Sequence, residues 1–196
     1  DAAHATVRRM SGLAMGAEPE RVRTAVVTGR TPAEGLHRLA ETDRALAIVV
    51  GSSHRGRLGR VTPGSTAARL LSGAPCAVAL APDGYRTRAE QPITRVGVAF
   101  DGSQESRNAF AVALAAAHAY DAELEVITVI PTEVYGAPGY ELLRADVESV
   151  LRRQHEDALV DLPETTRVRS TVVDGDPAQR LAERSGELDL LVIGSR

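Results

Sequence analysis

The sequence predicts an α/β fold of the doubly wound class, in which helices cover both faces of a parallel sheet, and three observations predict it. Segments of Val, Ile and Leu without polar alternation, such as residues 46–51 and 189–194, are typical of strands buried on both faces of a sheet. These segments alternate with segments of helical periodicity, which is the element order of a parallel sheet. The third observation is an internal repeat, which indicates that the architecture is used in tandem.

The repeat is clearest where residues 21–29 (RVRTAVVTG) return as residues 167–175 (RVRSTVVDG). Both copies continue with a capping residue, then a proline at the first helical position, then Glu or Gln at the third, in residues 31–34 and 176–179. This is the pattern of a capping box with proline at the first helical turn. Both copies are therefore expected to continue into a helix.

Each of these helices is followed by a strand that ends in Gly-Ser, at Gly51-Ser52 and at Gly194-Ser195. Two complete copies at this spacing would need more than the 196 residues of the chain. We therefore expect a tandem repeat in which each copy is incomplete, with the later part of one copy preceding the earlier part of the next.

The first part of the chain, residues 1–82, is expected to form the carboxyl-terminal part of the first domain. Its predicted elements are a helix end at 2–15, a strand at 22–28, a helix at 32–42, a strand at 46–51, a loop at 52–63, a helix at 64–72 and a strand at 76–81. Residues 83–92 are polar, rich in turn residues and without periodicity, so they are predicted to be the linker.

Residues 93–196 are expected to form the amino-terminal part of the second domain. The predicted elements are strands at 95–100, 123–130, 167–173 and 189–194, helices at 104–119, 140–158 and 177–185, and a Pro/Gly loop at 131–139.

Composition excludes several classes of function. Aromatic residues make up only 3% of the chain and Trp is absent, which disfavours stacking platforms for bases. The net charge of −3 argues against binding to nucleic acid or to an anionic membrane. No apolar run approaches the roughly 20 residues that span a bilayer, and the first ten residues lack the order of a signal peptide. We therefore expect a cytoplasmic protein.

The basic residues and the single cysteine narrow the chemistry further. All 23 basic residues are arginine, which excludes the Walker phosphate loop and every lysine nucleophile within this sequence. Cys76 stands alone and can form neither an internal disulfide nor a cysteine zinc site. Any phosphate bound here would be held by backbone amides, hydroxyl groups and guanidinium groups.

Ligands of doubly wound sheets bind beyond the carboxyl ends of the strands, where the strand order reverses. One feature at such an end is the loop from Gly51, which leads through Pro63 to Gly64-Ser65-Thr66 at the start of a predicted helix. Glycines let the backbone approach a ligand, and the free amides of a helix start attract anions. The hydroxyl groups of Ser65 and Thr66 could cap the helix or donate to phosphate oxygens. The other features at strand ends are Asp101-Gly102-Ser103, Val129 to Pro131 and Gly194-Ser195.

The segment 98–103 (VAFDGS), the glycine loop that ends in Gly64-Ser65, and the strand at 75–78 (PCAV) together resemble the universal stress protein family, with two tandem domains. The resemblance covers nearly the whole chain except the linker and much of residues 131–165. It implies a Rossmann-like, five-stranded parallel sheet in each complete copy. It also implies binding of ATP, with or without Mg²⁺, because many members bind ATP through a Gly-x2-Gly-x9-Gly-[Ser/Thr] loop.

In the first copy, the resemblance assigns that loop to a definite set of residues. Gly51 matches the first glycine, followed by Ser52, and Gly64-Ser65 matches the last pair, followed by Thr66. The middle glycine is replaced by His54, and Gly56 follows two residues later. Because a histidine places a ring where the family pattern leaves room for backbone beside phosphate, the second domain is the better candidate for a working site.

In the second copy, the resemblance assigns a role to the end of each of three strands. Asp101 matches the acid that holds the ribose or the metal of the nucleotide, Ala99 lines the pocket, and Val129 offers a backbone contact to adenine. Gly194-Ser195 matches the start of the second glycine loop. The resemblance therefore implies a stress-response protein that acts by binding an adenine nucleotide and by association, without catalysis.

Several alternatives remain open from the residues alone. Asp101 could be only a cap for the helix at 104–119, and the arginines of the loop could be a solvated patch. The chain could also be an association module that docks through its edge strands and needs no nucleotide. A smaller possibility is an ATP-using enzyme of the adenine-nucleotide α-hydrolase type, whose Ser-Gly-Gly-x-Asp-Ser motif is matched only in its tail. A Ser-His nucleophile at Ser52 to His54 is disfavoured, because no third, orienting acid is placed by the sequence. A zinc site is disfavoured because the other histidines, His4, His37, His118 and His155, are scattered over different predicted helices without ligand spacing.

Overall fold

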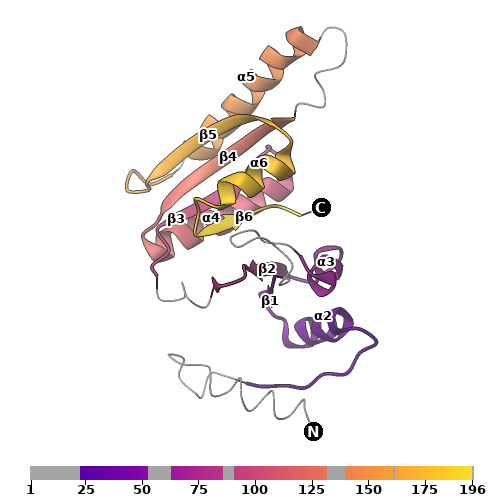
Figure 1. Ribbon diagram of the computed structural model, residues 1–196. Helices are drawn as coiled ribbons and strands as arrows, with labels where there is room; N and C mark the ends of the chain where they lie inside the picture. Colours follow the sequence, from indigo (N-terminus) through magenta and orange to yellow (C-terminus); the bar gives the residue numbers. More distant parts are fainter. Residues whose placement is uncertain (1–22, 53–62, 86–90, 132–139, 161, 196) are drawn as a thin grey trace. The chain divides into compact units, whose positions relative to one another are not determined.

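The computed structural model describes residues 23–52, 63–85, 91–131, 140–160 and 162–195. These residues form two compact units, the first ending at Asp83 and the second starting at Gly84. Figure 1 shows their helices and strands. The described helices and strands lie within a residue or two of their predicted bounds, with one exception in the first unit.

The first unit contains α2 (Pro32–Asp43), β1 (Ala47–Gly51), α3 (Ser65–Leu71) and β2 (Ala77–Ala81). The two strands are parallel and pair in the register Ile48 with Val78. As the capping pattern predicts, the hydroxyl of Thr31 accepts a hydrogen bond from the Glu34 amide at 3.2 Å and so fixes the start of α2. A small core lies between the helices and the sheet, formed by Ala33, Ala40, Ile48 and Leu70.

The exception is the strand predicted at residues 22–28. Residues 23–29 adopt no regular structure, so this prediction is wrong for the described part of the segment. The repeat supplies a physical reason: the second copy of the segment is β5 (Val168–Gly175), which forms because it pairs with β4 (Glu123–Pro131). Among the described residues of the first unit, no strand corresponds to β4, so residues 23–29 have no neighbouring strand with which to form ladder hydrogen bonds.

The second unit carries a four-stranded parallel sheet with three helices. Its elements are β3 (Arg95–Ala99), α4 (Gln104–Tyr120), β4, α5 (Tyr140–Leu159), β5, α6 (Pro177–Ser185) and β6 (Leu190–Val192). The strand order is β5-β4-β3-β6. The doubly wound α/β class is therefore confirmed, but the described sheets have two and four strands, and the expected five-stranded sheet is not formed in either unit. In the first unit, one of the expected strands that is not formed is the segment 23–29, which has no strand to pair with.

One face of the four-stranded sheet packs against α4 and α5. Alanines of α4 meet the sheet, and Ala113 and Ala117 are almost completely buried. Because alanine is small, the helix backbone can approach the strands closely, which is how a chain with few aromatic residues fills its core. The strand residues of this core are Val96, Val98, Leu124 and Val126, and Ala158 and Leu159 of α5 pack against it.

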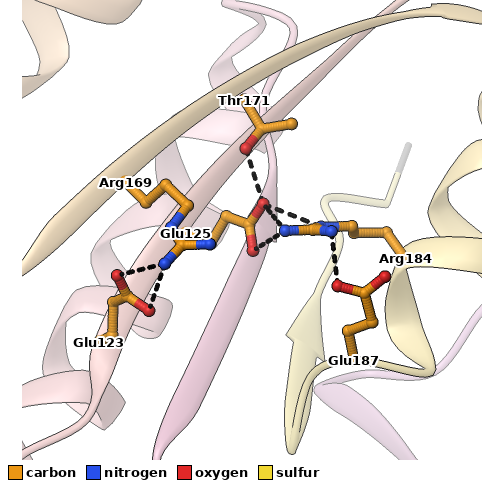
Figure 2. A network of polar contacts seen from close by, with 6 residues as sticks. All are labelled: Glu123, Glu125, Arg169, Thr171, Arg184 and Glu187. Atoms are coloured by element: carbon orange, nitrogen blue, oxygen red, sulfur yellow. Dashed lines mark hydrogen bonds and ion pairs between the residues drawn. The ribbon is translucent and has the colours of Figure 1, made fainter.

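The opposite face of the sheet is joined to α6 by a buried ion pair, shown in Figure 2. Glu125 of β4 is only 4% exposed. Its carboxylate accepts hydrogen bonds from Nε and Nη2 of Arg184 at 2.9 and 3.0 Å and from the hydroxyl of Thr171 at 2.7 Å. Arg184 also binds Glu187 at 2.6 Å. The pair fixes α6 on the sheet by satisfying a carboxylate that would otherwise be costly to bury.

Across the described segments, no helix has both the length and the apolar character needed to cross a membrane.

Candidate functional site

The strand order of the second unit creates a crevice beside β3. From β3 the chain adds β4 and then β5 on one side, and it returns to place β6 on the other side of β3. The carboxyl ends of β3 and β6 are therefore neighbours at the point where the strand order reverses. This is the position where doubly wound sheets bind ligands.

The turn after β3 is built around Asp101. One carboxylate oxygen of Asp101 accepts hydrogen bonds from the backbone amide of Ser103, at 3.0 Å, and from the Ser103 hydroxyl. The Ser103 hydroxyl in turn caps α4 by accepting from the Ser106 amide at 3.2 Å. The alternative in which Asp101 itself caps the helix is therefore wrong: Ser103 is the cap, and Asp101 orients it.

Glycine is required within this turn and opposite it. Gly102 has a φ of +76°, a conformation that residues with a Cβ rarely adopt. Gly194, two residues beyond β6, lies so close to α4 that a Cβ atom there would stand 2.7 Å from the backbone carbonyl of Glu105. The structure thus brings the end of β6 against the first turn of α4, beside the Asp101 turn. Ser195 follows at the end of the described residues.

Ala99 and Val129 lie on one face of the sheet near the same edge. Ala99 pairs with Ile127 across the two strands, and Val129 is two residues further along β4, so their side chains point to the same side. Both side chains are half-buried. The predicted roles of Ala99 in lining the pocket and of Val129 in contacting adenine through its backbone stay predictions.

In the first unit, the described part of the predicted glycine loop starts at β1 and resumes at α3. Gly51 ends β1, and the amide of Ser52 donates to the carbonyl of Ala81 at 2.8 Å. Gly64 is the cap residue of α3, with no side-chain hydrogen bond, and Ser65 and Thr66 open the helix. His54 and Gly56 lie outside the described residues.

A hollow of about 160 Å³ lies between the starts of α2 and α3. It is lined by Ser65 and Thr66, by Thr31 and Pro32 at the start of α2, and by Ala33 and Arg69. Ser65, Thr66 and Arg69 therefore border the same hollow. We assign no ligand to it.

Sequence reasoning missed three residues beside the Asp101 turn. Thr128 of β4 and His155 of α5 are 1% and 2% exposed, and their side chains are 3.2 Å apart. The side chain of Gln154 lies against Gly102. The sequence offered no signal for this cluster, because His155 belongs to a set of histidines scattered along the chain without ligand spacing.

No group of three or more His, Cys, Asp and Glu side chains that could hold a metal ion occurs in the ranges that the structure describes. At the β3 end, the carboxylate placed for such a role is that of Asp101. One carboxylate fits a metal ion that arrives with its other ligands already supplied by phosphate oxygens and water.

The sequence itself matches the profile described as the Universal stress protein family over residues 2–82 and 92–196. A universal stress protein of Mycobacterium tuberculosis strain H37Rv is 30% identical over 160 residues, which cover 79% of this chain and 53% of that protein. The chain therefore spans about half the length of the curated relatives it matches.

Solved structures give a consistent fold. A putative universal stress protein from Pseudomonas aeruginosa UCBPP-PA14 has a TM-score of 0.61 at 15% identity, over 95% of this chain and 64% of that one. A universal stress protein solved in complex with cAMP has a TM-score of 0.40 at 25% identity, over 52% of this chain and 76% of that one. The first likeness shows the fold alone, and the second is too distant to indicate a ligand.

Proposed function

The chain belongs to the universal stress protein family, and we propose that its second unit binds an adenine nucleotide such as ATP in the crevice between the ends of β3 and β6. The observation that carries the proposal is the meeting of the Asp101 turn, the start of α4 and Gly194 where the strand order reverses. The protein then acts by binding and association, without turnover of the nucleotide.

The chemistry of this edge suits a nucleoside. A carboxylate held by the Ser103 amide is a hydrogen-bond acceptor fixed in place, which suits the two hydroxyl groups of a ribose. Glycine at positions 102 and 194 lets these strand ends pack closely, because a Cβ atom would meet the Gln154 side chain at the first position and the Glu105 backbone at the second. Where Mg²⁺ accompanies the nucleotide, Asp101 would supply one carboxylate ligand, and phosphate oxygens and water the rest.

Replacing Asp101 by asparagine is expected to weaken ATP binding by about tenfold or more, the usual cost of removing the charge from a charge-assisted hydrogen bond. The asparagine oxygen can still accept from the Ser103 amide, so the turn keeps its shape. The measurement is the thermal shift in millimolar MgATP, followed by titration calorimetry. Asp146→Asn, the same chemical change at an exposed position of α5, is the control and should leave the shift unchanged.

The proposal also predicts that the protein carries nucleotide when purified from cells. Denaturing a purified sample and applying the supernatant to an anion-exchange column at 260 nm would reveal ATP, ADP or AMP. If no nucleotide is released and MgATP causes no thermal shift, the nucleotide proposal is wrong and association alone becomes the better function.

One observation favours association as a second candidate. In the described part of the first unit, β2 pairs with β1 and with no other strand. Its other edge therefore has backbone groups with no strand partner, and a strand of another domain or chain could pair there. The Ala81 carbonyl accepts from Ser52, which directly follows β1, so Leu80, one residue earlier, directs its backbone N–H to the other edge of β2. Sedimentation equilibrium of the wild-type chain and of Leu80→Pro, which removes that donor, tests this candidate. A monomeric wild type would contradict it.

A further inference from the structure

Two consecutive residues of α5 contact the end of β3 on either side of Asp101. The Gln154 amide group occupies the space beside Gly102, where a Cβ atom would lie 2.0 Å from its oxygen. The His155 ring packs against Phe100, with ring centroids 5.4 Å apart. The residues immediately before and after Asp101 are therefore both covered by one turn of α5, although α5 and β3 are far apart in the sequence.

A buried hydrogen-bond relay links His155 to the backbone of β3. The Thr128 hydroxyl donates to the carbonyl oxygen of Phe100 at 2.6 Å, and its oxygen lies 3.2 Å from Nδ1 of His155. Because a hydroxyl has one proton, and Thr128 gives it to Phe100, the threonine must accept from His155. Nδ1 therefore carries a proton. The buried Nε2 has no hydrogen-bond partner among the described residues, which favours its unprotonated form and so a neutral ring.

We propose that His155 is a positioning residue for the ligand site: through Thr128 and the Phe100 carbonyl it holds the end of β3, and with it the Asp101 carboxylate, in the orientation that binds the nucleotide. This inference rests on the proposed function. The inference goes beyond the proposed function by assigning a role to His155, which lies on α5 and not at the end of a strand. The relay acts on a carbonyl adjacent to Asp101, so a small rotation there moves the carboxylate directly.

The surroundings of the His155 ring favour its neutral form. Burial lowers the pKa of His155, and the charge of Arg152 on the same helix lowers it further, while the Val126 backbone carbonyl acts in the opposite direction. Among the described residues, the contacts found for the ring are with uncharged groups: the Thr128 hydroxyl on β4 and the ring of Phe100, directly after β3, with Phe110 of α4 against Phe100. A proton added at Nε2 would therefore enter a site with little to stabilise its charge.

The stability of the second unit should consequently fall in mild acid. The unfolded chain binds a proton at His155 below its ordinary pKa of about 6.5, whereas the folded unit does so only at lower pH. Unfolding therefore takes up a proton in this window, and the free energy of unfolding decreases as the pH falls below about 6.5. Urea unfolding at several pH values should show this slope in the wild type and a smaller slope in His155→Asn, whose side-chain amide can still donate to Thr128 but does not titrate. Equal slopes in the two proteins would contradict the neutral relay.

The decisive experiment compares MgATP affinity at pH 7.5, by titration calorimetry, among four variants. Thr128→Val and His155→Leu each break the relay and are expected to weaken binding by about tenfold, the usual cost of one buried hydrogen bond. Thr128→Ser keeps the hydroxyl and should bind like the wild type. Leu159→Ala loosens α5 through the core without touching the relay, so it should lower the melting temperature but leave the affinity almost unchanged.

The outcomes separate this inference from the proposed function. If wild type binds MgATP and Thr128→Val binds equally well, or if Leu159→Ala weakens binding as much as His155→Leu, the positioning role is overturned and the nucleotide site stands. If wild type binds no adenine nucleotide, the proposed function fails, and amide hydrogen exchange at Ser103 decides the relay. Faster exchange in Thr128→Val than in Thr128→Ser supports it, and equal exchange overturns it.

Discussion

Replacing Glu125 by alanine is expected to lower the free energy of unfolding of the second unit by about 3–5 kcal/mol, the usual result of removing one partner of a buried ion pair. The Glu125 side chain is 5% exposed and that of Arg184 is 26% exposed, and the two groups share a bidentate contact. Without the carboxylate, the guanidinium group and the Thr171 hydroxyl both lose their acceptor on the sheet. Because Arg184 is partly exposed and also binds Glu187, we expect a value near the lower end.

The same strand provides a matched control, visible in Figure 2. Glu123 lies two residues earlier on the same face and pairs with Arg169 at 3.2 Å, but the Arg169 side chain is 53% exposed. An exposed pair of this kind contributes about 0–1 kcal/mol, so Glu123→Ala should be nearly neutral. Urea unfolding followed by circular dichroism measures both variants. Equal losses in the two would show that burial does not distinguish the pairs.

The sequence could not predict this ion pair. Residues 123–126 (ELEV) alternate polar and apolar, which is also the pattern of a strand with one face in water. Arg184 is 59 residues away from Glu125 in the chain. Only the placement of α6 over that face of the sheet decides that one glutamate is buried and the other is not.

Local patterns, in contrast, predicted the elements well. The predicted capping residues Thr31 and Asp176 both accept a backbone hydrogen bond at the start of a helix, as short polar side chains at that position do, whereas the cap of α4 is Ser103 and not the alternative Asp101. Capping depends on neighbours within one turn, so the sequence contains all of the necessary information. The segment 22–28 shows the limit: its composition favours a strand, but a strand also needs a partner, which no local pattern can supply.

The candidate site shows the same difference between residues that local sequence patterns can identify and residues that only the packing of distant segments brings together. The sequence placed Asp101 and Gly194 at strand ends, and the structure places both at the reversal of strand order. Thr128 and His155 could not be identified because each is an ordinary residue of its own element. Their significance arises only from a 3.2 Å contact between a strand and a helix 27 residues apart.

Replacing Gly194 by valine is expected to abolish the MgATP-dependent thermal shift and to cost about 1–3 kcal/mol of stability, the usual effect of overpacking. A Cβ atom at this position would lie 2.7 Å from the backbone of Glu105, and a helix backbone cannot move aside as a flexible side chain can. The tip of β6 must therefore shift away from α4, and the crevice beside Asp101 changes shape. Urea unfolding and thermal shift with and without MgATP measure the two effects.

The internal repeat supplies the control for this variant. Gly51 holds the equivalent place before Ser52 in the first copy, yet a Cβ atom there would meet no atom of the described residues within 4 Å. Gly51→Val should therefore leave stability almost unchanged, because neither glycine has a positive φ and only one has a close neighbour. If the two variants lose stability equally, the contact between Gly194 and α4 is not what fixes the end of β6. The same Gly-Ser dipeptide thus has two different structural roles, and only the packing around each copy distinguishes them.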